Sequence, residues 1–198
     1  LMGVYFRQSD WARVIPIAKD VQQRLQAKLG ETHVATWISL GNLGRAHYEA
    51  GDAATASPIL REAHQRLLSV AGAANPQTQD VVLVRASAAL AQGLSAHDLL
   101  SALDPAILEN GRSTGYWPQT LDLLQGMQAV IDGNPVCAQH LLLTGLSALQ
   151  ADPASRRSRL YRDAEAALAR LAESAAPTTD ATTCPTPRTG SAQPTPAS

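Results

Sequence analysis

The residues of this sequence best suited to chemistry are its five histidines and two cysteines. Cys137 and His140 lie three positions apart, a spacing that places them on one face of a helix, where an imidazole could activate a thiol for nucleophilic catalysis. The other histidines are scattered, and no pair has metal-ligand spacing with carboxylates nearby. His47 fits the packing register of its helix better than a catalytic role. The favoured interpretation is a structural role for both His47 and Cys137.

Motifs of the common enzyme classes are absent from the sequence. It contains no P-loop, nucleophile elbow, dinucleotide fingerprint or kinase signature. Cys137 and Cys184 lie far apart, which indicates neither a disulfide framework nor a metal site. We therefore expect no catalytic, cofactor-binding or metal-binding residues, no cofactor, and a chain that is not an enzyme.

Composition favours helices and excludes some partners. Of the 198 residues 45% are hydrophobic but only 4% aromatic, and Ala and Leu dominate, which favours helices packed through small side chains. A net charge of −1 offers no electrostatic reason to bind nucleic acid or anionic membranes. No apolar run approaches the ~18 residues of a membrane span. Arginines at 156–162 could meet an acidic partner, although a solvated helix face is the favoured interpretation.

One segment of the sequence occurs twice. Residues 16–36 recur 42 positions later as residues 58–78, with Gln-Arg-Leu, Gly and Thr conserved between the copies and like-for-like changes elsewhere. A fixed offset of this size is typical of a solenoid, in which each repeat buries its apolar face by stacking on its neighbours. The sequence therefore predicts an all-α fold of the α-solenoid class.

Each repeat is expected to hold two antiparallel helices, A and B. In the clearest copy, helix A begins near His33, and helix B follows Gly51-Asp52, where Gly suits the chain reversal and Asp can cap the next helix. The next helix A starts at Asn75-Pro76, and its helix B, at 97–108, is degenerate. The apolar stripes are Leu40, Leu43, Gly44 and His47 on helix A, and Ala56, Leu60, Ala63 and Leu67 on helix B.

The remaining repeats are less regular. A partial copy precedes the first, with its helix B after Ser9-Asp10, and a fourth pair at 119–131 and 135–149 has drifted by two residues. Pro16 and Pro58 lie about six residues into their B helices. They either kink these helices or mark their true starts, with Ser57 as the cap of the second.

The two ends of the chain are expected to differ from its middle. A last helix at about 154–173 would close the stack, so the repeat domain is predicted to cover residues 1–174. Residues 175–198 are rich in Pro, Thr and Ser and are expected to be disordered. Because the chain begins at Leu1, part-way through a helix of the repeat register, we expect it to be a fragment of a longer protein.

The spacing of Leu40, Leu43-Gly44, His47, Gly51, Ala56, Leu60 and Ala63 resembles the tetratricopeptide repeat. The 42-residue period is similar to the longer repeat of kinesin light chains and many bacterial proteins, which carries a Gly, His, Pro and Thr signature. One copy here keeps Gly30, His33 and Thr36, and the other keeps Gly72, Pro76 and Thr78, with Asn75 in place of His. The resemblance covers about residues 1–149.

The resemblance implies a right-handed superhelix whose A helices line a concave groove for a protein or peptide segment. Asn42 and Arg45 could bind a peptide's backbone or carboxylate, and Tyr48 could pack on an apolar side chain; a solvated helix face is the alternative. For the apolar positions of the later repeats, the alternative of simple core is favoured. The implied groove residues are Ile38, Gly41, Asn42, Arg45, Tyr48 and Glu49, then Leu83, Ser87 and Leu90, then Leu123, Met127 and Val130.

The implied function is a non-catalytic scaffold that binds a protein or peptide. It would be the regulatory or sensor module of a larger bacterial protein, such as a winged-helix transcriptional regulator or a Ser/Thr kinase. The alternative is self-association, with the N-terminal edge stacking on a second copy to give a homo-oligomer. We expect a cytoplasmic location, or a periplasmic one if a preceding segment carries a transmembrane helix.

Overall fold

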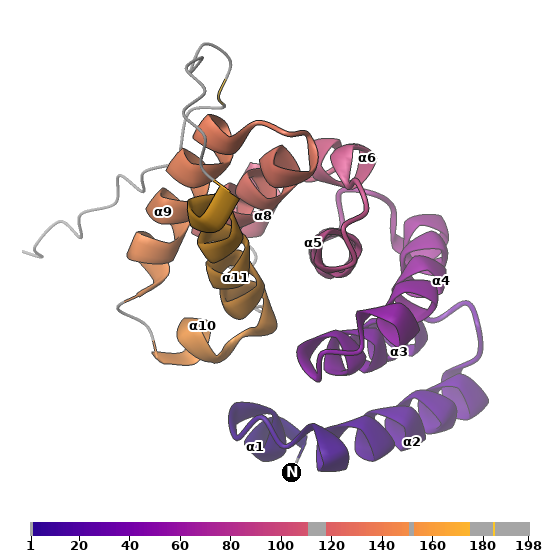
Figure 1. The fold of residues 1–198 in the computed structure, drawn as a ribbon. Coiled ribbons are helices and arrows are strands. Elements are labelled where there is room, and N and C mark those ends of the chain that lie inside the picture. The colour runs from indigo at the N-terminus through magenta and orange to yellow at the C-terminus, as the bar shows by residue number, and fades with distance from the viewer. Residues whose placement is uncertain (1, 111–117, 151–152, 175–183, 185–198) are drawn as a thin grey trace, which may run out of the picture.

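The computed structural model describes residues 2–110, 118–150, 153–174 and Cys184. Within these residues all regular secondary structure is helical and no strand occurs, which confirms the predicted all-α class (Figure 1). Apart from Cys184, the predicted tail lies outside the described residues. The helices are α1 (Met2–Arg7), α2 (Trp11–Leu29), α3 (Val34–Glu49), α4 (Ala53–Ala71), α5 (Pro76–Ala91), α6 (His97–Ser101), α7 (Pro105–Asn110), α8 (Pro118–Ile131), α9 (Pro135–Leu149), α10 (Pro153–Arg157) and α11 (Arg159–Ser174).

The starts of the helices follow the repeat. α3, α5 and α8 begin at Val34, Pro76 and Pro118, a constant spacing of 42 residues. α3 and α5 each have 16 residues, whereas α8 has 14. Gly126, which packs on Leu142 as Gly44 packs on Leu60, lies 82 residues after Gly44, whereas the starts of α3 and α8 lie 84 residues apart. The two-residue drift of the fourth repeat therefore arises between Pro118 and Gly126.

Side-chain caps explain why the helices begin where they do. At the starts of α2, α4 and α9, the carboxylate or amide oxygens of Asp10, Asp52 and Asn134 accept hydrogen bonds from the backbone N–H three residues on, at 3.3, 3.0 and 3.1 Å. At the starts of α3 and α5, His33 and Asn75 accept from the N–H two residues on, at 3.2 and 2.8 Å. His33 and Asn75, at equivalent positions of two repeats, thus both act as N-caps.

The two prolines lie inside their helices. α2 begins at Trp11 and α4 at Ala53, so Pro16 and Pro58 are interior residues. Asp52 is the cap of α4, and the alternative in which Ser57 caps a helix starting at Pro58 is wrong. Both prolines are solvent-exposed.

The degenerate helix B of the third repeat is not one helix. α6 has five residues and α7 has six, and a break at residues 102–104 separates them. Every other helix B in the described residues has between 15 and 19 residues. α6 packs against α5 and α8.

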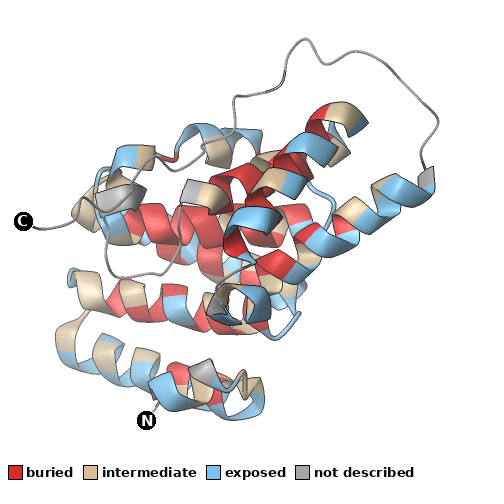
Figure 2. Cartoon of the chain, turned by 90° about the vertical axis from the view of Figure 1, so that its left-hand side faces the viewer, coloured by how far each residue is buried: buried red, intermediate tan, exposed pale blue. Residues whose placement is uncertain are grey.

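The described helices pack in neighbouring pairs, chiefly α2 with α3, α3 with α4, α4 with α5, and α8 with α9. Small residues bring paired helices close together: a Cβ at Gly44 of α3 would lie 2.7 Å from Leu60 Cγ of α4, and one at Gly126 of α8 would lie 2.8 Å from Leu142 Cγ of α9. Buried residues concentrate in the middle helices, whereas α2 buries only Val14 and Ala18 (Figure 2). Val21, which shares the helical spacing of Val14 and Ala18, is exposed.

The last helix does more than cover the end of the row of pairs. α11 packs on α8 and α9 and also contacts α3, more than 100 residues earlier in the chain (Figure 1). It buries one apolar face: Leu160, Ala164 and Ala167 belong to a core cluster with residues of α8 and α9, and Leu168 and Leu171 pack against it. None of the helices in the described ranges combines the length and apolar character that a membrane span needs.

Candidate functional site

The predicted groove residues of α3 form a strip along one helix face that begins at the surface and ends in the interior. Asn42 is exposed, Ile38 is half-buried, and Arg45 is mostly buried and ion-paired with Asp80 of α5. Tyr48 and Glu49 at the end of the strip are only 1% and 5% exposed. The outer portion of the strip, Ile38 and Asn42, is therefore accessible to solvent. The inner portion, Tyr48 and Glu49, is buried and contacts α11.

The inner end of the strip is held to α11 by polar contacts. The Tyr48 hydroxyl lies 3.1 Å from Asp163 Oδ2, and the Arg159 backbone N–H donates to Glu49 Oε2 at 2.8 Å. Arg159 Nε also donates to Asp163 Oδ1 at 2.7 Å, across one turn of α11. Two residues predicted to bind a partner thus bind a helix of the same chain.

The electrostatics of this junction centre on Glu49. Burial raises the pKa of the Glu49 carboxyl above its ordinary 4.5; the hydrogen bond from Arg159 and the charges of Arg45 and Arg162 offset only part of this shift. Arg162 is exposed on α11, so a basic side chain borders the strip where α3 meets α11. The end of the strip nearest α11 therefore carries positive charge.

The predicted groove residues of the later repeats belong to the core. Ser87 is buried and donates its hydroxyl hydrogen to the Leu83 carbonyl at 3.0 Å, and Met127 is buried among residues of α8, α9 and α11. Three further positions of this set are also buried: Leu83, Leu90 and Leu123. Their burial agrees with the interpretation of the apolar positions as core.

The cysteine and histidine candidates do not form a catalytic pair. Cys137 is buried, whereas His140 is exposed. Cys184 lies against Cys137, and burial together with this second thiol raises the pKa of Cys137 to about 12. His47 is half-buried, with Nδ1 3.5 Å from Asp52 Oδ2. In the described part of the chain, no three His, Cys, Asp or Glu side chains come together as a metal site.

Two contacts escaped the sequence analysis. The sequence predicts a solvated face for Arg159, whereas this residue forms an ion pair with Asp163, and their spacing of four on a helix is a signal of such a pair. The proximity of Cys184 to Cys137 had no signal, since the 46 residues between them carry no motif that places the tail.

Comparison with known proteins does not identify the family of the chain. No protein-family model matches the sequence, and no curated protein matches it. The resemblance to tetratricopeptide repeats therefore depends on the residues of this chain alone, and what it implies about function belongs to the following proposal.

Proposed function

We propose that the chain is an α-solenoid of the tetratricopeptide type, a right-handed superhelix that acts as a non-catalytic scaffold and binds a protein segment. The 42-residue spacing of helix starts and the recurring caps support the repeat part of this proposal. In keeping with the resemblance, the chain would be the regulatory module of a larger bacterial protein, such as a winged-helix regulator or a Ser/Thr kinase, acting in the cytoplasm.

The observation that carries the binding proposal is the strip on α3. Its inner end already accepts a helix, since Tyr48 and Glu49 contact α11 through hydrogen bonds. Its outer end, at Ile38 and Asn42, remains accessible beside that helix. α11 itself is not displaced by the partner, because Leu160 and Ala164 are part of the core. The partner segment would instead lie along the outer strip and end against α11.

The chemistry of the strip favours a particular partner. Asn42 offers an amide that can pair with the backbone of an extended or helical segment, and Ile38 offers apolar contact. Arg162, exposed on α11, offers a positive charge. The partner would therefore combine an apolar side chain with an acidic residue near one end.

A peptide selection tests this proposal. Random 12-residue peptides displayed on phage would be selected on the full chain, and the binding of the selected peptides would be measured by fluorescence anisotropy. Asn42→Ala should weaken binding about fivefold, the loss of roughly one hydrogen bond, and Arg162→Gln should weaken peptides that contain acidic residues. Arg24→Gln, which removes an exposed charge from α2, serves as the control and should change nothing.

Two results would reject the groove on α3. Selected peptides that bind the Asn42→Ala and Arg162→Gln variants as tightly as the wild type bind elsewhere. A molecular mass that rises with concentration in light scattering, with no peptide selected, would favour self-association of the chain instead.

A further inference from the structure

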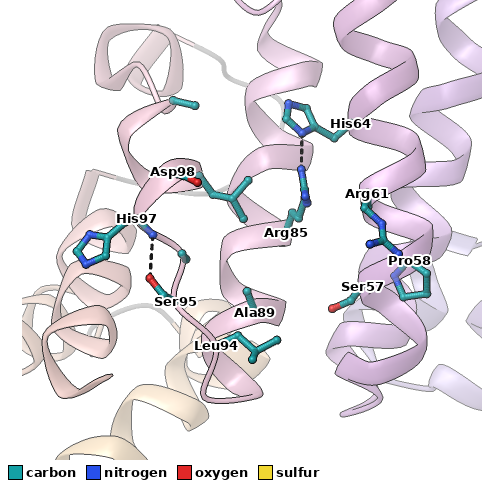
Figure 3. Close-up of a pocket in the computed structure, with 13 residues that line it drawn as sticks. Ser57, Pro58, Arg61, His64, Arg85, Ala89, Leu94, Ser95, His97 and Asp98 are labelled. Atoms are coloured by element: carbon teal, nitrogen blue, oxygen red, sulfur yellow. Dashed lines mark hydrogen bonds between the residues drawn. The ribbon is translucent and has the colours of Figure 1, made fainter. Parts of the chain in front are cut away.

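A pocket of about 650 Å³ lies between α4, α5 and the segment around α6, away from the strip on α3 (Figure 3). The pocket exists because α6, the first part of helix B in the third repeat, ends after five residues. No long helix therefore covers the line of contact between α4 and α5, here called the seam. Its volume lies within the range of about 300–1,000 Å³ that is usual for small-molecule sites. The pocket is therefore a product of the interrupted repeat.

Two guanidinium groups line the pocket. Arg61 extends from α4 and Arg85 from α5, and Figure 3 shows Arg85 meeting His64 across the space between these helices. Arg85 Nη1 lies 2.8 Å from His64 Nδ1. Since a guanidinium can only donate, His64 accepts through Nδ1 and is neutral. Burial and the positive charge of Arg85 lower the pKa of His64, which keeps it neutral.

The positive charge of this wall is not neutralised by an ion pair in the described part of the chain. Among the described residues, neither Arg61 nor Arg85 forms an ion pair with a carboxylate. Burial and the nearby charge of Arg61 lower the pKa of Arg85, so a partly desolvated guanidinium lies close to a second, exposed one. Asp98 also lines the pocket, from α6, and leaves the lining with a net positive charge. An oxyanion bound between the guanidinium groups of Arg61 and Arg85 would relieve the repulsion between their charges.

Part of the remaining wall is apolar. Leu94 is 56% exposed, and Pro58, Ala89 and Leu99 line the same space. A bare inorganic anion would leave this surface in contact with water. A ligand that fills the pocket would therefore join an anionic head to a short apolar group.

We propose that this pocket binds a small organic oxyanion, a carboxylate or a phosphate ester that carries a short apolar chain. Arg61 and Arg85 hold the oxyanion, and Leu94 and Pro58 contact the chain. This proposal is independent of the peptide site on α3, since the two share no residue.

Calorimetric titration of the full chain tests the proposal with four probes: hexyl phosphate, hexanoate, inorganic phosphate and 1-hexanol. Hexyl phosphate or hexanoate should bind with a Kd of about 1 mM or tighter, and 1-hexanol should bind much more weakly. The tighter of the two amphiphilic probes identifies the head group. Arg61→Gln should raise its Kd roughly 10-fold, since a charge-assisted pair is lost, and Leu94→Ser should weaken it without affecting inorganic phosphate.

Arg61 is exposed, so Arg61→Gln should leave the fold intact, which thermal unfolding would verify. Arg24→Gln on α2 removes the same charge far from the pocket and should leave the Kd unchanged. The proposal is overturned if neither amphiphilic probe saturates the chain by about 10 mM. It is also overturned if Arg61→Gln binds like the wild type, or if Arg24→Gln weakens binding equally, which would indicate diffuse charge attraction.

Discussion

Replacing Gly44 by alanine tests how closely α3 and α4 pack. A Cβ at this position would lie 2.7 Å from Leu60 Cγ and 2.8 Å from Leu60 Cδ2, well inside the usual carbon contact of about 3.5–4.0 Å. Leu60 is fully buried in the core cluster around Trp37, so it cannot move away freely. Overpacking costs about 1–3 kcal/mol, while Gly→Ala within a helix gains about 0.5–1 kcal/mol. We expect Gly44→Ala to lower the free energy of unfolding by about 1 kcal/mol.

Leu60→Ala completes a double-mutant cycle. Alone it should cost about 2–5 kcal/mol, as other buried leucine truncations do. In the double variant the methyl group at residue 44 occupies part of the space that the Leu60 side chain leaves. The clash with Leu60 therefore disappears, while the stabilisation of the helix by Gly→Ala remains. The double variant should therefore be more stable than the sum of the single effects predicts, by about 1–2 kcal/mol.

Urea unfolding followed by far-ultraviolet circular dichroism measures all these variants. Gly3→Ala is the matched control, because a Cβ at Gly3 of α1 would have no neighbour within 4 Å. It should be neutral or slightly stabilising. If Gly44→Ala is as harmless as Gly3→Ala, or if the effects at Gly44 and Leu60 simply add, the close approach of α3 and α4 at this point is incorrect.

Three further predictions concern single residues. Ser9 has a φ of 55° at the reversal where later repeats place glycine, so Ser9→Gly should raise the free energy of unfolding by about 0.5–1 kcal/mol in the same urea assay; a loss would contradict the strained backbone. Because burial raises the pKa of Glu49, its carboxyl group stays protonated to higher pH in the folded state than in the unfolded state. Ionisation of Glu49 should therefore lower the free energy of unfolding progressively as the pH rises from 4.5 to the pKa of the folded state. Glu49→Gln should therefore gain stability relative to the wild type as the pH rises, and a constant difference in urea midpoint would refute this. The Cys137 thiol, with a pKa raised to about 12, should resist a thiol reagent at neutral pH in the folded chain and react once urea unfolds it; rapid modification of the native protein would contradict its burial.

The helices of this chain could be predicted because their signals are local. The caps Asp10, Asp52 and Asn134 stand directly before the helices they start, and a 42-residue offset transfers one well-marked copy to a weaker one. The same locality explains the uncertainty over Pro58. A proline six residues into a helix is a strong breaker signal, and only the hydrogen bond to Asp52 shows that the helix begins earlier.

The candidate site could be predicted less well because it depends on contacts between distant segments. The sequence pattern marks Tyr48 and Glu49 as polar positions on a helix face, which favours an exposed groove. Tyr48 is buried in the core cluster around Trp37, and both residues contact α11, which begins 110 residues after Glu49 at Arg159. A helical periodicity identifies the apolar face of α11 but does not determine which surface that face will cover.

Two departures from the repeat produce both of the surfaces at which we propose binding. A helix pair in the middle of a row buries apolar surface on both sides, whereas a pair beside a shortened helix leaves part of it open. After α5, the short α6 leaves the seam of α4 and α5 open, and Arg61 and Arg85 line it. After α9, α11 packs on the apolar surface of α8 and α9. In this position its first residue also contacts Glu49 of α3. A chain with a full-length helix in place of α6 would fill the pocket, and such an insertion should abolish oxyanion binding while the strip on α3 is unchanged.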